Sequence, residues 1–118
     1  MQLRDQQRLV KIKEYCEDIQ ASMNRFGHSS SIFYEDSTYQ FSVAFCLLQI
    51  GELVGKLTEE YRAATRAQIP WPQIKGLRNV IVHDYGSIDL EGIWKTITSS
   101  IPELYRFCCE QLKENEQE

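Results

Sequence analysis

The side chains best suited to chemistry lie in one short run of the chain, residues 76–85, which reads GLRNVIVHDY. Within this run Arg78 and His83 are five residues apart. A guanidinium binds phosphate oxygens and stabilises negative charge that develops on them. An imidazole that titrates near neutral pH can take the proton from an attacking hydroxyl or give one to a leaving oxygen. Together these two groups are the minimal set for phosphodiester chemistry.

A helical backbone would decide how these groups relate to one another. On an α-helix Asn79 and His83 are four residues apart and share a face, so the amide can orient the imidazole. Arg78 and Tyr85 are seven residues apart and share another face. Arg78 and His83 lie about 140° apart around the axis. They can therefore meet at one ligand only across the helix end or where the backbone departs from ideal geometry, and Gly86 permits such a departure.

The same residues allow a purely structural interpretation. Arg78 would then pair with an acid in a buried polar network, and His83 would bind carbonyl groups at the helix end. The five-residue spacing alone does not separate the two interpretations. Asp84 and Asp89 lie near His83, but such a grouping is commonplace, and we expect no metal site. The sequence has no glycine-rich nucleotide-binding motif, and we expect no cofactor.

Apolar residues recur every three or four positions, as in amphipathic helices. The first helix is expected to end at Gly27, a C-terminal cap, and residues 28–36 are expected to form a loop. Asp36 or Ser37 is expected to cap a second helix over roughly residues 38–67. The apolar stripes are Leu9, Ile12, Cys16, Ile19, Met23 and Phe26 in the first helix, and Val43, Leu47, Ile50, Val54, Leu57 and Tyr61 in the second.

A third and a fourth helix are expected after a proline-containing break. Pro72 suits the first turn of a helix over roughly residues 72–84, and Ser87 or Asp89 is expected to cap the fourth helix. Pro102 falls inside the apolar stripe of that helix, where its missing N–H predicts a kink or a break. The stripe consists of Leu90, Ile93, Ile97, Ile101, Leu104, Cys108 and Leu112.

The predicted second helix carries a second apolar stripe, made of Phe41, Phe45 and Leu48. A surface helix needs only one apolar face, so two faces indicate burial in a core on one side and against a partner subunit on the other. The sequence shows no alternating strand pattern. We therefore predict a single domain over residues 1–118 with an all-α fold, an up-and-down bundle of four or five helices.

Composition limits the class of protein further. The 118 residues are 42% hydrophobic, enough for one core, and the four cysteines lack C-x-x-C spacing and are expected to be reduced thiols. We find no signal-peptide pattern and no membrane-spanning segment, and we expect a cytoplasmic protein. Trp71 and Trp94 are expected in the core, and His28 is expected to be an incidental exposed residue.

The charge of the chain is unevenly distributed. A net charge of −4 argues against non-specific coating of nucleic acid. Residues 61–85, however, carry four basic residues and one acid, a local charge of +3, whereas residues 103–118 carry five acids and two bases, a local charge of −3. A polyanion is therefore expected to bind the first region and avoid the second.

The run from Arg78 to Tyr85 resembles the R-N-x-x-x-H-x-Y signature of HepT-like HEPN proteins. Further segments, which together cover roughly residues 41–108, fall in family-like order and spacing. Asp84 stands where many relatives have glycine, and Gly86 where many have an aromatic residue. The other family-like segments are Ile50-Gly51-Glu52, Ile69-Pro70-Trp71, Ile74-Lys75-Gly76-Leu77, Asp89-Leu90 through Trp94, and Pro102-Glu103-Leu104.

The resemblance implies a HEPN-like fold and a metal-independent endoribonuclease, the toxin of a bacterial toxin–antitoxin pair, with RNA and in particular tRNA as substrate. It implies that Arg78 and His83 are catalytic, that Asn79 supports them, and that Tyr85 accepts AMP from an MntA-like nucleotidyltransferase antitoxin, which silences the nuclease. It also implies a homodimer. We expect cleavage by the RNA's own 2′-OH, leaving a 2′,3′-cyclic phosphate.

Two other functions remain open from the sequence. One is a catalytically inactive HEPN module that binds a nucleotide or a substrate for a partner nucleotidyltransferase, and the other is a plain helical interaction protein. The presence of Arg78, Asn79, His83 and Tyr85 together favours the ribonuclease, because a pure binding module does not need a proton-transfer group. The acidic net charge slightly favours the binding module.

Overall fold

The computed structural model describes the backbone of residues 1–83 and 89–117 and the side chains of residues 1–78 and 89–114. In these ranges every regular element is helical, which confirms the predicted all-α fold. The longer helices are α1 (Leu3–Phe26), α3 (Ser37–Lys56), α5 (Trp71–His83) and α7 (Ile101–Gln117). The shorter elements are α2 (Ser30–Glu35), α4 (Glu59–Thr65), α6 (Leu90–Lys95) and the π-helical turn η1 (Thr96–Ser100).

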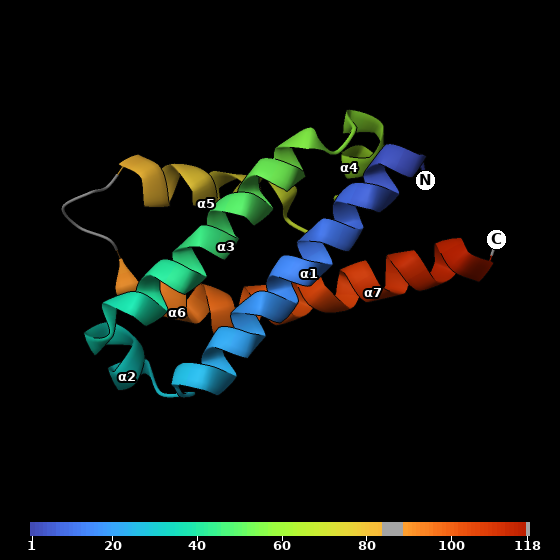
Figure 1. Cartoon of the computed structure of the whole chain (residues 1–118). Coiled ribbons are helices and arrows are strands. Elements are labelled where there is room, and N and C mark those ends of the chain that lie inside the picture. Colours follow the sequence, from blue (N-terminus) through green and yellow to red (C-terminus); the bar gives the residue numbers. More distant parts are fainter. Residues whose placement is uncertain (84–88, 118) are drawn as a thin grey trace.

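The core lies between α1, α3, α5 and α7. Helix α3 returns alongside α1, α5 packs against α3, and α7 packs against α1 (Figure 1). The predicted apolar stripes form most of the buried core, so the periodicity of the sequence is confirmed in space. Trp71 is only 2% exposed and Trp94 packs against the core, as predicted.

The continuous helix predicted over residues 38–67 is wrong. Helix α3 ends at Lys56 and α4 begins at Glu59, and the two axes are bent by 103°. The corner is held by Thr58, whose N–H and hydroxyl donate to the Asp5 carboxylate at 2.9 and 2.7 Å. Asp5 is 1% exposed, so these hydrogen bonds are shielded from solvent and tie the corner to α1. The Thr58 hydroxyl also accepts from the backbone N–H of Tyr61 and thereby caps α4.

The loop predicted over residues 28–36 contains the short helix α2 and is a second correction. Phe33 of α2 is fully buried. Its ring centroid lies 4.9 Å from that of Tyr39 and 5.5 Å from that of Trp94. Burial of this one aromatic ring explains a helical turn in a polar, serine-rich segment, because its packing outweighs the weak local propensity.

The predicted helix caps are confirmed. Gly27 ends α1 with φ 128°, a conformation that L side chains rarely adopt. The Asp36 carboxylate accepts from the N–H of Tyr39 at 3.1 Å, and the Asp89 carboxylate accepts from the N–H of Gly92 at 2.9 Å. These contacts set where α3 and α6 begin.

The predicted disturbance at Pro102 is confirmed and takes the form of the π-helical turn η1. Pro102 has no N–H, and its ring would collide with the carbonyl of Thr98 in a regular α-helix. The chain widens instead, and the N–H of Ile101 donates to the carbonyl of Thr96, five residues earlier. The break therefore precedes the proline by one turn.

No single helix in the described ranges has both the length and the apolar composition to cross a bilayer. Only α3 and α4 taken together pass that test, and the bend of 103° separates them.

Candidate functional site

Helix α5 carries the candidate site. Its backbone is helical from Trp71 to His83, so Arg78 and His83 belong to one helix and lie about 7.5 Å apart along its axis. The side chains of Asn79 and His83, and the whole of Tyr85, lie outside the described residues. The meeting of Arg78 and His83 at one ligand, across the helix end or where the backbone departs from ideal geometry, stays a prediction. The geometry that follows is that of Arg78 and its surroundings.

The Arg78 side chain is exposed and held at one atom. Its Nε lies 2.8 Å from Oε1 of Glu52 on α3, an ion pair whose two side chains are 56% and 39% exposed. This contact is made at Nε of the guanidinium. The two terminal nitrogens, which form the fork that binds phosphate oxygens, are not engaged by it. The structural interpretation predicted that Arg78 pairs with an acid in a buried polar network. Arg78 does pair with an acid, but the pair lies at the surface.

A glycine brings the two helices together at Arg78. A Cβ atom on Gly51 would lie 3.2 Å from Cβ of Arg78 and 3.4 Å from both the Arg78 nitrogen and the Lys75 carbonyl oxygen. Few side-chain carbons are accommodated that closely. The dipeptide Gly51-Glu52 therefore does two things: the glycine permits the close approach of α3 to α5, and the glutamate next to it holds the guanidinium.

A shallow hollow of about 220 Å³, which we call the Arg78 groove, opens beside this contact. Three cations and one carboxylate line it, and the carboxylate is the one already paired with Arg78. A small anion would meet a surplus of positive charge there. The groove is lined by Gly51, Glu52, Gly55, Lys56, Lys75 and Arg78.

Sequence reasoning assigned no role to Glu52 or Lys56, and it included Lys75 only in the basic region, residues 61–85, that is expected to bind a polyanion. Glu52 and Arg78 are 26 residues apart, and their contact depends on the packing of α3 against α5. The one indication in the sequence was the family-like order of residues 50–52 and 74–77. It points to both segments but does not indicate that they contact each other.

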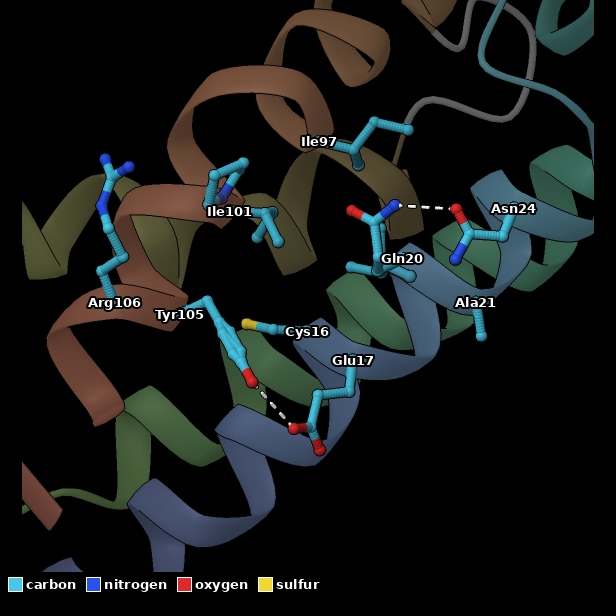
Figure 2. Close-up of a pocket in the computed structure, with 11 residues that line it drawn as sticks. Cys16, Glu17, Gln20, Ala21, Asn24, Ile97, Ile101, Tyr105 and Arg106 are labelled. Atoms are coloured by element: carbon cyan, nitrogen blue, oxygen red, sulfur yellow. Dashed lines mark hydrogen bonds between the residues drawn. The ribbon is translucent and has the colours of Figure 1, made fainter. Parts of the chain in front are cut away.

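A larger hollow lies elsewhere, between α1, η1 and α7, and measures about 470 Å³ (Figure 2). Four of its polar side chains are hydrogen-bonded in pairs, since the Tyr105 hydroxyl donates to Glu17 at 2.9 Å and the Gln20 amide donates to Asn24 at 3.1 Å. Most of its exposed lining is apolar, and Arg106 is the one cation among its lining residues. We therefore place the candidate site at the smaller Arg78 groove, which three cations line.

Cys16 in the wall of that larger hollow is not an activated nucleophile. Burial raises the pKa of its thiol to about 12, and burial raises the pKa of Cys46 to about 11. Burial also raises the pKa of Cys108. These thiols stay protonated at neutral pH, and only the thiolate is a strong nucleophile or metal ligand. Among the described residues, no three acidic, histidine or cysteine side chains are grouped as metal ligands would be.

Two aromatic side chains of α3 face solvent in this chain. Phe41 is 68% exposed and Phe45 is 56% exposed, while Leu48 is half-buried. We call these three residues the α3 aromatic face. Glu52 is the next residue in the same 4-3-4 spacing, so this face leads along the helix to the Arg78–Glu52 pair. His28 is exposed, as predicted, and its Nε2 lies 2.8 Å from Oδ1 of Asn24.

Comparisons with known proteins cover most of the chain. Residues 12–110 match the family described as Ribonuclease HepT-like. The chain is 35% identical over 78 residues to "Putative RNase TTE0752" of Caldanaerobacter subterraneus subsp. tengcongensis. The aligned segment covers 66% of this chain and 69% of that protein. It is 29% identical over 97 residues to "Probable ribonuclease HepT" of Thermococcus cleftensis, with 78% and 87% covered. It is also 29% identical over 96 residues to "Putative RNase MJ1216" of Methanocaldococcus jannaschii, with 81% and 77% covered. No solved structure is a significant match.

Proposed function

Because the chain belongs to the Ribonuclease HepT-like family, we propose that it is a metal-independent endoribonuclease in which Arg78 and His83 are the catalytic pair. The observation that carries the proposal is the setting of Arg78. Its guanidinium is exposed, is paired with Glu52 at Nε, and lies in a basic groove on the helix that also carries His83. Asn79 supports the imidazole from one turn earlier on the same helix.

The proposed reaction uses a nucleophile that RNA itself supplies. The 2′-OH attacks the neighbouring phosphorus, the bond from O2′ to phosphorus forms, and the bond from phosphorus to O5′ breaks. His83 takes the proton from the 2′-OH and delivers a proton to the leaving O5′, so the products are a 2′,3′-cyclic phosphate and a free 5′-OH. Arg78 stabilises the charge on the non-bridging oxygens through its terminal nitrogens. A metal-bound water has no part in these steps.

The active unit that we propose is a homodimer formed across the α3 aromatic face. Two large aromatic rings at more than half exposure are unusual on a helix that also buries its other face. In a two-fold dimer each copy would present the same face to the other. Since Glu52 continues that face, the two Arg78 grooves would lie near the interface and would supply two catalytic pairs to one RNA.

We also propose that the protein is the toxin of a toxin–antitoxin pair, with tRNA as substrate and an MntA-like nucleotidyltransferase as antitoxin. Transfer of AMP to Tyr85 would add bulk and negative charge two residues beyond His83, and would exclude the RNA backbone by occlusion and repulsion. Tyr85→Phe should stay toxic and gain no mass of AMP when incubated with the partner and ATP. Neutralisation of this variant by the transferase would contradict Tyr85 as the acceptor.

A second candidate function is an inactive HEPN module that binds a nucleotide or substrate for the transferase. The net charge of −4 and the occupation of Arg78 Nε by Glu52 favour it.

Cleavage of tRNA in EDTA separates the two functions. We expect the wild-type protein to cut RNA under these conditions and to leave cyclic phosphate ends. His83→Ala and Arg78→Ala should each lose at least about a hundredfold in rate. His28→Ala is the matched control, because His28 is the other histidine of the chain and is exposed away from α5. A requirement for a divalent cation, or equal activity of His83→Ala and His28→Ala, would contradict the ribonuclease mechanism.

A further inference from the structure

A second basic hollow adjoins the Arg78 groove. It measures about 420 Å³ and lies between α4 and the start of α5, and we call it the α4–α5 hollow. Lys75 lines both hollows, so they are neighbours on one surface. The lining consists of Glu59, Arg62, Ala63, Arg66, Trp71, Pro72 and Lys75.

Four of the five cations that line the two hollows lie in two pairs, and the fifth is Lys56. Arg62 and Arg66 are one turn apart at α4, and Lys75 and Arg78 are one turn apart on α5, so each pair is separated by about 5–6 Å at Cβ. Within residues 1–78 and 89–114, the ion pairs are Lys11–Glu14 and Arg78–Glu52. No carboxylate of that part of the chain therefore lies within 4.0 Å of Arg62, Arg66 or Lys75, and the lining of the hollow has three cations and one acid, Glu59.

Arg62 carries an unsatisfied donor. Its Nε is buried and has no hydrogen-bond partner among the described residues. An unpaired buried donor destabilises a folded protein by about 1–3 kcal/mol, and such groups often mark places where a water, an ion or a ligand belongs. Since Arg62 lines the α4–α5 hollow, an anionic oxygen bound there is our candidate for the missing acceptor.

The frame around this hollow is rigid. Asp5 and Thr58 fix the corner before α4, and the Trp71 indole donates to the Thr65 hydroxyl at 2.8 Å, which ties the end of α4 to the start of α5. The indole of Trp71 is 2% exposed and cannot stack on a base. The hollow thus offers charge without a stacking surface, which suits a phosphate backbone rather than a particular base.

We propose that Arg62, Arg66 and Lys75 form a phosphate track that leads to Arg78 and holds the RNA backbone on one side of the scissile phosphate. This rests on the proposed function. RNA is the occupant that these observations favour, because one continuous polyanion would fill both hollows and end at the reacting phosphate. The contacts of the track increase with the length of the RNA, so long substrates bind better than a dinucleotide, and the preference is independent of base sequence.

Binding of fluorescent single-stranded RNA to the full chain carrying His83→Ala tests the track without cleavage. The test compares a triple variant, Arg62→Gln, Arg66→Gln and Lys75→Gln, with a control that loses three exposed cations elsewhere, Lys95→Gln, Arg106→Gln and Lys113→Gln. The affinity of an oligonucleotide of about 12 residues is measured over a range of salt concentrations.

We expect the triple variant to bind the oligonucleotide at least about tenfold more weakly, with a salt slope shallower by about 2, since each phosphate contact contributes about 0.7 for single strands. The loss should grow with RNA length and be equal for different base sequences, while the control should bind as its parent does. Equal losses in the triple variant and the control, or an unchanged salt slope, would overturn the track. RNA cleavage by the wild-type chain is measured separately. Failure of the track alone would appear as cleavage with unchanged RNA binding in the triple variant, and failure of the proposed function would appear as no cleavage by the wild-type chain.

Discussion

Arg78 and Glu52 form an ion pair in which Nε of the guanidinium lies 2.8 Å from Oε1 of the carboxylate. The pair joins α5 to α3 next to the close approach of the two helices at Gly51. It restrains the guanidinium at Nε, and the terminal nitrogens are the atoms with which an arginine binds phosphate as a fork.

Glu52→Ala should change KM and kcat in different ways. Removal of the carboxylate takes away a negative charge beside the RNA, so KM should fall or stay the same. The freed guanidinium should lose its orientation, and kcat should fall by about tenfold to a hundredfold. Steady-state kinetics on one RNA measure both quantities, and Glu59→Ala is a control for the change in charge. An unchanged kcat would contradict a positioning role for Glu52.

Gly51→Ala should disturb the site more than the fold. The added methyl would lie 3.2 Å from Cβ of Arg78, so α5 must shift by a few tenths of an ångström. Alanine gains about 1 kcal/mol of helix propensity over glycine, which offsets the strain in the free energy of unfolding. We expect near-wild-type stability in urea and a loss of at least about fivefold in cleavage rate.

Gly76→Ala, on α5, provides the matched control for this change. A Cβ atom on Gly76 would meet no atom within 4 Å, and Gly76 does not line the Arg78 groove. This substitution gains the same helix propensity and should leave cleavage within about twofold of wild type. Equal losses of activity in the two variants would show that Gly51 has no special role.

Phe45→Glu should weaken self-association. A charge at a position that is 56% exposed in one chain does little to its own fold. In a dimer buried across the α3 aromatic face, the same charge would be desolvated and unpaired, and the dissociation constant should rise by at least about tenfold. Analytical ultracentrifugation measures this. Ile32→Glu, at an exposed apolar residue of α2, should leave the dimer intact.

Asp5→Ala should destabilise the fold through the corner between α3 and α4. It removes both acceptors of Thr58, one of them from a backbone N–H, at a site that is 1% exposed. We expect a loss of about 2–3 kcal/mol in the free energy of unfolding, measured in urea. Asp18→Ala, at an exposed position of the same helix, should change stability by less than about 0.5 kcal/mol.

The buried thiols predict how stability depends on alkaline pH. The folded pKa of Cys16 is raised to about 12 and that of Cys46 to about 11, from a value of 9.0 without burial. Above pH 9 the unfolded chain releases these protons first, so the free energy of unfolding should fall as the pH rises from about 9 to about 11. Replacement of Cys16 and Cys46 by alanine should make this slope shallower in urea titrations. An identical slope in both proteins would contradict the raised pKa values.

The sequence predicted the helical class, the buried stripes and the caps, because each depends on residues only a few positions apart. It did not predict the corner at Thr58, since Leu57 and Tyr61 keep the spacing of the stripe through the bend and both remain buried. The cause of that bend, Asp5, is 53 residues earlier in the chain. A local pattern cannot report such a contact.

The candidate site, like the fold, could be predicted only in part. Arg78 was identified from its own neighbours in the sequence. The cations of residues 61–85 were expected to bind a polyanion. Their arrangement beside Arg78 and the pairing of Arg78 with Glu52 were not predicted, because both depend on the packing of α3 and α4 around α5. Residues that act at a distance in sequence become visible only with the fold.

The placement of Trp71 gives the protein a built-in optical probe. This indole sits in the first turn of the helix that carries Arg78, whereas Trp94 lies against Phe33 and Tyr39 in another part of the core. In a Trp94→Phe background the remaining emission would come from the start of α5 alone. Fluorescence could then follow the opening of that helix in real time, without any attached dye, as RNA or a second subunit is added.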